Sequence, residues 1–274
     1  MKLSIVYSTH QTQFQAATLS GSLEENLSRI AELGYHGVEL AIRDPNLVDI
    51  NNLDTILKKS GLKVPAIGTG QAWGEEGLSF TDPDHSIRKK AVDRILSHIP
   101  VAHHFDSVII IGLIRGTLKP NVSHPQAIEW LVEALQTCCK KAQEFQVRLA
   151  LEPINRYETS LVNNVTQGLE LIAAVEAENF GLLLDTFHMN IEEPDIEESI
   201  LKCGQRLFHF HVADSNRWYP GAGHLNFQSI LSALSAAKYR GFISGEFLPF
   251  PNVDEAASKN IEYFTSILPT INVQ

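Results

Sequence analysis

The sequence predicts an α/β protein folded as one closed (β/α)₈ barrel over residues 1–274. Short apolar segments alternate with longer amphipathic ones, as in parallel sheets whose strands are joined by helices. Eight such pairs fit within 274 residues, and a barrel of this type takes about 250. The first strand is followed by Ser8-Thr9-His10-Gln11. Because a glycine-rich phosphate loop is missing there, an open doubly wound sheet is the weaker alternative.

In the first half of the chain, apolar strands alternate with helices that have recognisable ends. We expect strands at Leu3–Tyr7, Gly37–Leu40, Val64–Gly68 and Ser107–Gly112. We expect helices at Leu23–Leu33, Ile50–Lys59, Asp84–His104 and Pro125–Phe145. Ser22 is a plausible cap of the first helix, with Glu25 at the capping-box position. Gly34 and Gly61 follow the first two helices, where glycine commonly ends a helix.

The second half continues the alternation. The expected strands are Arg148–Glu152, Gly181–Asp185, Leu207–Ala213 and Ile243–Phe247. The expected helices are Thr166–Glu176, Ile196–Leu201, Phe227–Ala237 and Glu255–Leu268. Two longer connections, Gly70–Pro83 and Gly112–Ser123, are candidate lids over a site.

Composition excludes several classes of protein. The net charge is −10 and no Lys/Arg tract exceeds three residues, so no nucleic-acid partner is expected. No apolar run reaches the roughly 18 residues that span a bilayer. The N-terminus lacks a signal-peptide core, and the three cysteines form neither a disulfide framework nor a metal knuckle. We therefore expect a cytoplasmic protein. A homo-oligomer is a possible assembly.

Each of the last four strands carries an ionisable residue near its C-terminal end, where such barrels place their chemistry. These residues are Glu152, Asp185, His211 and Glu246. Three buried carboxylates repel one another unless a cation compensates them. Oxygen ligands with one imidazole suit Mn²⁺ or Mg²⁺, with Co²⁺ or Zn²⁺ possible. Taken alone, Glu152 could be a loop residue and Asp185 could cap a turn. Four ionisable residues at the ends of four successive strands instead favour one divalent metal site.

A second group of polar residues lies in loops at the predicted mouth. Its members are Glu158, His188, Arg217, Trp218, Arg43, Arg115 and Arg156. Four arginines clustered there in an acidic protein suggest a ligand with a carboxylate or phosphate; the alternative is solvated loop charge. Trp73 and Trp218 could form an apolar wall, and His209 is assigned to the barrel interior rather than to the metal.

These residues resemble the xylose-isomerase-like TIM-barrel family over essentially the whole chain. Gly34–Leu40 is similar to the family's second-strand signature, and the four candidate ligands match its metal ligands. Within the family, His188, Arg217 and Glu158 match the D-tagatose 3-epimerase group, the ketose 3-epimerases. The stretches most similar to the 5-keto-L-gluconate epimerase branch are Ala41–Pro45, Ile67–Ala72, Asp185–Glu193 and His209–Trp218.

The resemblance implies a metal-dependent isomerase that inverts a ketose at C3, with a ketohexuronate interconverted with D-tagaturonate as substrate. Inversion through an enediolate needs proton exchange on both faces. The resemblance supports Glu152 and Glu246 as the two catalytic carboxylates. His188 and Arg217 would hold oxygens near C1 and C2, and Arg43, Arg115 or Arg156 would receive a distal carboxylate.

Three other functions stay open. An aldose–ketose or hydroxypyruvate-type isomerase would use the same metal and one base. A related DNA-repair endonuclease would need further zinc ligands, yet the fourth strand ends Ile110-Ile111-Gly112 without a histidine. A non-catalytic sugar-binding protein would not need the intact pair Glu152 and Glu246.

Overall fold

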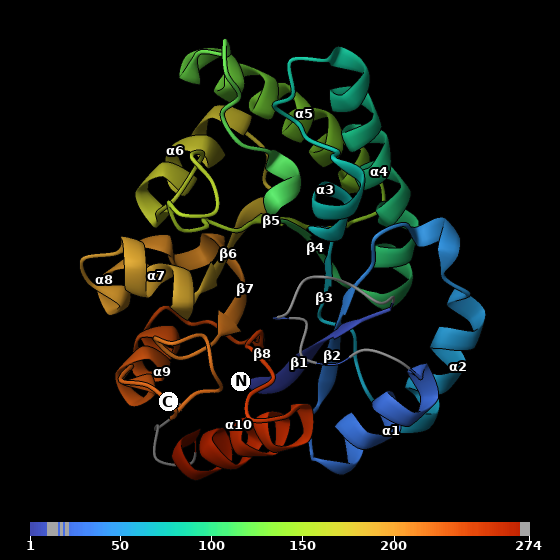
Figure 1. Ribbon diagram of the computed structural model, residues 1–274, viewed down its shortest axis with the longest axis vertical. Helices are drawn as coiled ribbons and strands as arrows, with labels where there is room; N and C mark the ends of the chain where they lie inside the picture. The colour runs from blue at the N-terminus through green and yellow to red at the C-terminus, as the bar shows by residue number, and fades with distance from the viewer. Residues whose placement is uncertain (10–15, 17–18, 20–21, 269–274) are drawn as a thin grey trace.

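The computed structural model describes residues 1–9, 16, 19 and 22–268, which contain a closed barrel of eight parallel strands in chain order (Figure 1). Each strand pairs with its sequence neighbours, and β1 pairs with β8 to close the barrel. The strands are β1 (Lys2–Ser8), β2 (Gly37–Ala41), β3 (Ala66–Gly68), β4 (Val108–Ile111), β5 (Leu149–Leu151), β6 (Phe180–Asp185), β7 (Leu207–Val212) and β8 (Phe242–Gly245). The predicted fold class is confirmed.

Helices surround the strands on the outside (Figure 1). The long ones are α1 (Leu23–Glu32), α2 (Ile50–Ser60), α4 (His85–Phe105), α5 (His124–Glu144), α6 (Val165–Val175), α8 (Ile196–Cys203), α9 (Phe227–Ala236) and α10 (Val253–Ile267). They match the eight expected helices within a few residues. None of the helices in the described ranges is both long and apolar enough to cross a membrane.

Short helical segments fill the connections at the carboxyl ends of the strands. They are α3 (Gln71–Glu76), α7 (Thr186–Glu192) and the 3₁₀ turns η1 (Pro45–Leu47), η2 (Leu113–Arg115) and η3 (Gly204–Arg206). The two candidate lids thus contain α3 and η2. Segments this short lack the repeated turns from which an amphipathic pattern is recognised.

Helix ends follow from local chemistry. Asp49, Ser123 and Asn164 accept hydrogen bonds from first-turn N–H groups of the helices they precede. The predicted capping box at Ser22 is wrong within the described residues, because its side chain makes no cap bond. Its carbonyl oxygen instead accepts from the backbone N–H and the side-chain amide of Asn26.

The apolar core of the described residues consists of two larger clusters and the separate pair Val6 and Ala41. The larger lies between strands and helices, and alternate strand residues build a smaller cluster from Ala66, Val108, Ile110, Ala150 and Leu183. Ile110 also lines the cavity described below. Because successive strand residues face opposite sides, this smaller cluster is the apolar filling of the barrel interior, beneath the cavity.

Candidate active site and metal centre

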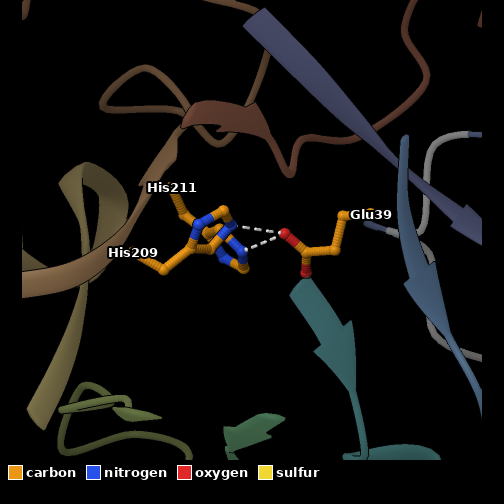
Figure 2. Close-up of side chains that lie close together, drawn as sticks. All are labelled: Glu39, His209 and His211. Atoms are coloured by element: carbon orange, nitrogen blue, oxygen red, sulfur yellow. Dashed lines mark hydrogen bonds and ion pairs between the residues drawn. The ribbon is translucent and has the colours of Figure 1, made fainter. Parts of the chain in front are cut away.

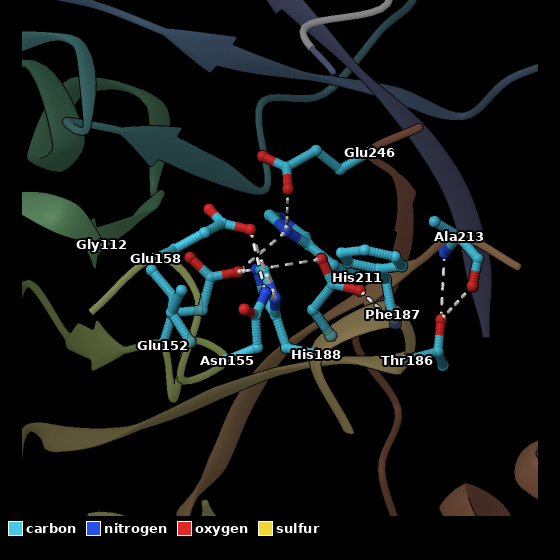
Figure 3. A network of polar contacts seen from close by, with 12 residues as sticks. Gly112, Glu152, Asn155, Glu158, Thr186, Phe187, His188, His211, Ala213 and Glu246 are labelled. Carbon is cyan, nitrogen blue, oxygen red and sulfur yellow. Dashed lines mark hydrogen bonds and ion pairs between the residues drawn. The ribbon is translucent and has the colours of Figure 1, made fainter. Parts of the chain in front are cut away.

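The carboxyl ends of β5 to β8 bring the four predicted ligands together, and Figure 3 shows Glu152, His211 and Glu246 among them. One ligand atom from each of Glu152, Asp185, His211 and Glu246 lies within 4.8 Å of the others, and the side chains are buried. Within the described part of the chain, Glu152 Oε1, Asp185 Oδ2 and His211 Nδ1 have no hydrogen-bond partner. Leaving such atoms unpaired is costly. Three carboxylates and one imidazole with unpaired atoms aimed together fit a divalent cation.

Burial and mutual repulsion shift the protonation of this cluster. Burial, reinforced by the charge of Glu246, raises the pKa of Glu152 well above its usual range. The same two causes raise the pKa of Asp185 to about 7. Burial opposes the charged form of His211, but Glu39 and Glu246 outweigh it and raise its pKa. Without a cation, the cluster therefore retains protons that a divalent ion would displace.

Glu39 is a site residue that the sequence reasoning missed. Its Oε2 accepts from Nε2 of His209 at 2.8 Å and from Nε2 of His211 at 2.9 Å (Figure 2). A neutral imidazole has one N–H, so each ring, when it is neutral as a metal ligand must be, carries that proton on Nε2. His211 Nδ1 then keeps its lone pair and faces Glu246 Oε2 at 3.6 Å. Glu39 thus orients His211 for a cation.

The signal for Glu39 was present in the sequence. It interrupts the apolar strand β2, just as the four candidate ligands interrupt theirs. His209 lies buried in the barrel, as expected, with Glu39 as its partner.

Glu39→Gln is expected to weaken Mn²⁺ binding about 10–100-fold. The amide offers no anionic acceptor to the two imidazoles, so His211 is held less firmly. Isothermal titration of the metal-free protein measures the dissociation constant. Glu178→Gln is the control, since its side chain is 94% exposed. Equal affinities in the two variants would show that Glu39 does not support the cation site.

Three further predicted residues line the same cavity: Glu158, His188 and Arg217. Arg217 Nη1 donates to Glu158 Oε1 at 3.0 Å, and its guanidinium lies over the Phe187 ring at 4.8 Å. His188 Nε2 lies 3.6 Å from Glu152 Oε1. Burial, with the nearby charges of Arg217 and Arg115, keeps the pKa of His188 well below its usual value. The sequence therefore placed these three side chains beside the carboxylate cluster.

The three other arginines are each bound to other groups of the protein. Arg115 is fully buried and donates to the backbone carbonyls of Gly112, Leu161, Val162 and Glu152. Arg43 Nη1 pairs with Glu75 at 2.7 Å, and Arg156 Nη2 pairs with Glu192 at 2.8 Å. None of the three is among the described residues that line the cavity. In this structure the three guanidiniums thus hold loops and helices together.

The two predicted wall tryptophans separate. Trp73 lines the cavity. Trp218 does not: it is 36% exposed and stacks on Phe250, with ring centroids 5.5 Å apart. Of the adjacent residues Arg217 and Trp218, only the arginine lines the cavity. In this structure the Trp218 ring therefore packs against Phe250 rather than against the described lining residues.

The cavity has two walls of different chemistry. The first-half wall, from β1–β4 and the loops after them, includes Val6, Ala41, Thr69, Gln71, Trp73, Ile110 and Leu113. The second-half wall, from β5–β8 and their loops, consists of Glu152, Ile154, Glu158, His188, His211, Arg217 and Glu246. Apart from Glu39 and Glu75, the ionisable residues described in the lining all belong to the second-half wall. The two walls together give the cavity a reactive side and a mostly uncharged side.

Comparisons with known proteins agree with this geometry. A family model described as xylose isomerase-like TIM barrel matches residues 27–267. An L-ribulose 3-epimerase of Mesorhizobium japonicum is 30% identical over 91% of this chain and 84% of its own. A D-psicose 3-epimerase of Ruminiclostridium cellulolyticum is 28% identical over 97% and 90%. The structure of a D-allulose 3-epimerase from Methylomonas sp. in complex with D-allulose aligns with a TM-score of 0.80, at 25% identity over 97% of this chain and all of that one.

The relatives are epimerases, which confirms the predicted isomerase class and the resemblance to the ketose 3-epimerase group. The family match covers far more than half of the sequence and includes all four candidate ligands. The chain therefore belongs to the xylose isomerase-like TIM barrel family.

Proposed function

We propose that this protein is a divalent-metal-dependent ketose 3-epimerase. One observation carries the proposal: two carboxylates, Glu152 and Glu246, reach the cavity from strands β5 and β8 and share one cation-binding cluster. Strands β6 and β7 separate them around the barrel, so they approach a bound substrate from different directions. The similar proteins named above are 3-epimerases, which supports the same reaction here.

Inversion at C3 needs one group to remove the proton from that carbon and another to return it on the opposite face. Glu152 and Glu246 fill these two roles. When bound, a divalent cation supplies a Lewis acid that polarises the ketone and stabilises the negative charge on oxygen. Both carboxylates line the cavity, so each can contact a bound substrate.

Neighbouring side chains hold the substrate and the bases. His188 Nε2 and the Arg217 guanidinium lie beside Glu152 and Glu246 respectively, with Arg217 Nη2 3.7 Å from Glu246 Oε2. We assign them to oxygens near C1 and C2. Glu158 Oε1 accepts from Arg217 and keeps the guanidinium directed at the cavity.

The substrate's far end distinguishes two ketose classes. The resemblance to 5-keto-L-gluconate epimerases favours a ketohexuronate, whose carboxylate needs a cation or other donors. Arg217 is the one Lys or Arg among the described lining residues, and we assign it to the reacting end. The geometry therefore favours a neutral ketose, and the ketohexuronate is the second candidate.

The test is deuterium incorporation in D₂O. Mn²⁺-loaded protein is incubated with neutral ketoses and ketohexuronates, and NMR locates the deuterium and identifies the product. We expect deuterium at C3 with inversion there, and a neutral ketose turned over at least as fast as the matching uronate. Deuterium at C1 or C2 with an aldose as product would identify an aldose–ketose isomerase instead. No exchange with any sugar would contradict the proposal and favour a sugar-binding protein.

A further inference from the structure

We infer that Asn155 is a positioning residue that presents His188 to the substrate as a neutral hydrogen-bond donor through Nε2. Asn155 lies three residues after Glu152 in the loop that follows β5 and is 1% exposed. Its side-chain amide contacts Tyr157, Glu158 and His188. Figure 3 shows Asn155 beside Glu158 and His188. The role of His188 toward the substrate rests on the proposed epimerase activity. The position of the proton on the His188 ring does not depend on that activity.

Two contacts determine which way the amide points. Asn155 Oδ1 accepts from the backbone N–H of Tyr157 at 2.9 Å. Asn155 Nδ2 donates to Glu158 Oε1 at 2.9 Å. A backbone N–H only donates and an ionised carboxylate only accepts. Reversing the amide would break both hydrogen bonds, so its orientation is determined at both ends.

The third contact then determines where the imidazole carries its proton. Asn155 Nδ2 lies 2.8 Å from His188 Nδ1. An amide NH₂ can only donate, so Nδ1 must accept and carries no proton. The remaining ring proton is therefore on Nε2. That nitrogen faces the cluster, 3.6 Å from Glu152 Oε1 and 4.0 Å from Asp185 Oδ2. A doubly protonated ring would set its Nδ1–H against the amide hydrogens.

The consequence is a division of labour in the site. His188 donates a hydrogen bond to a substrate oxygen, and this bond strengthens as negative charge develops on that oxygen. No proton leaves the imidazole, so Glu152 and Glu246 carry out both proton transfers. Asn155 also ties His188 to Glu158, the partner of Arg217, so one amide aligns both groups assigned to the oxygens.

The experiment compares Asn155→Asp with Asn163→Asp in the full chain. An aspartate at 155 still accepts from Tyr157 but requires a proton from His188 Nδ1. Asn163 is the matched control, because it lies in the same loop and its amide donates only to the carbonyls of Ile154 and Thr159. Ring ¹⁵N NMR of Mg²⁺-loaded protein reports the protonation of each nitrogen, with His188 assigned by its loss in His188→Asn.

We expect the wild type and Asn163→Asp to show His188 protonated on Nε2 alone, and Asn155→Asp to show protonation on Nδ1. In Asn155→Asp, kcat should fall about 100-fold, with Mg²⁺ affinity unchanged. If Asn155→Asp does not fold, Asn155→Ser replaces it and should show a mixture of the two ring forms with a smaller fall in kcat.

Wild-type His188 protonated on Nδ1 would overturn the inference whatever the activity. An unchanged imidazole in Asn155→Asp would show that Asn155 does not set it. A changed imidazole with full kcat would remove the catalytic role. Absence of epimerase activity in the wild type would refute the proposed function, while the NMR result would still decide how Asn155 acts on His188.

Discussion

Glu246→Gln and Glu152→Gln are each expected to lower the rate of epimerisation at least about 100-fold. Each change removes the group that exchanges a proton on one face of the substrate. Among the described residues, Asp185 is the one other carboxylate of the cluster. The measurement is kcat for conversion of the ketose to its C3 epimer, with bound Mn²⁺ determined in the same samples. Rates are compared at equal metal occupancy, because both residues are also candidate ligands.

Deuterium exchange separates the two carboxylates. A variant that retains one of them can still exchange the C3 hydrogen on one face, so substrate recovered from D₂O should contain deuterium without inversion. Glu178→Gln serves again as the exposed control and should retain full activity. Full epimerase activity in Glu246→Gln at normal metal content would refute the mechanism with two bases.

Removing the divalent cation is expected to make stability strongly dependent on pH. Burial and the charge of Glu246 raise the pKa of Asp185 from 3.8 to about 7, and the pKa of Glu152 is raised as well. At pH values between the unfolded and folded pKa of Asp185, the folded protein keeps a proton that the unfolded chain releases. The free energy of unfolding therefore decreases as pH rises from about 4 to 7. At 1.36 kcal/mol per pH unit, Asp185 alone accounts for roughly 4 kcal/mol.

A bound cation reverses this trend, because it binds the ionised ligands and its affinity rises with pH. At 100 times its dissociation constant, Mn²⁺ adds about 2.7 kcal/mol, which raises Tm by roughly 5–10 °C. Thermal denaturation with EDTA or Mn²⁺ at pH 5.5 and pH 8 measures both effects. We expect the larger increase in Tm at pH 8, and none in Asp185→Asn. The same increase at both pH values, or in that variant, would place the cation elsewhere.

The parts of the site that lie on strands could be predicted from the sequence. An apolar strand interrupted near its end by Glu152, Asp185, His211 or Glu246 identifies the residue, and the closed parallel barrel places the carboxyl ends of the strands at one rim. The position in the strand thus determines the position in space. Glu39 follows the same rule at β2, but its role depends on reaching His209 and His211 across the barrel, which the pattern of one strand does not reveal.

The roles of the loop residues could not be predicted in this way. Arg115 has backbone carbonyls as its partners, and every residue in a sequence has such a carbonyl. Arg156 pairs with Glu192, 36 residues away, and many other acids were equally available. A loop position indicates that an arginine lies near the mouth, but the loop's path determines whether it faces the ligand. Asn155 was missed for the same reason.

Because the cavity has two walls, the residues that carry out the reaction and the residues that select the sugar can change independently in evolution. The reactive groups belong to the C-terminal half of the barrel, whereas the opposite wall comes from Thr69, Gln71, Trp73 and their neighbours near α3 and η2. Substitutions in residues 69–75 can therefore alter which sugar is accepted without touching a base or a metal ligand. Relatives that act on different sugars can share one catalytic apparatus, and directed evolution of this enzyme toward a new sugar is best confined to that short segment.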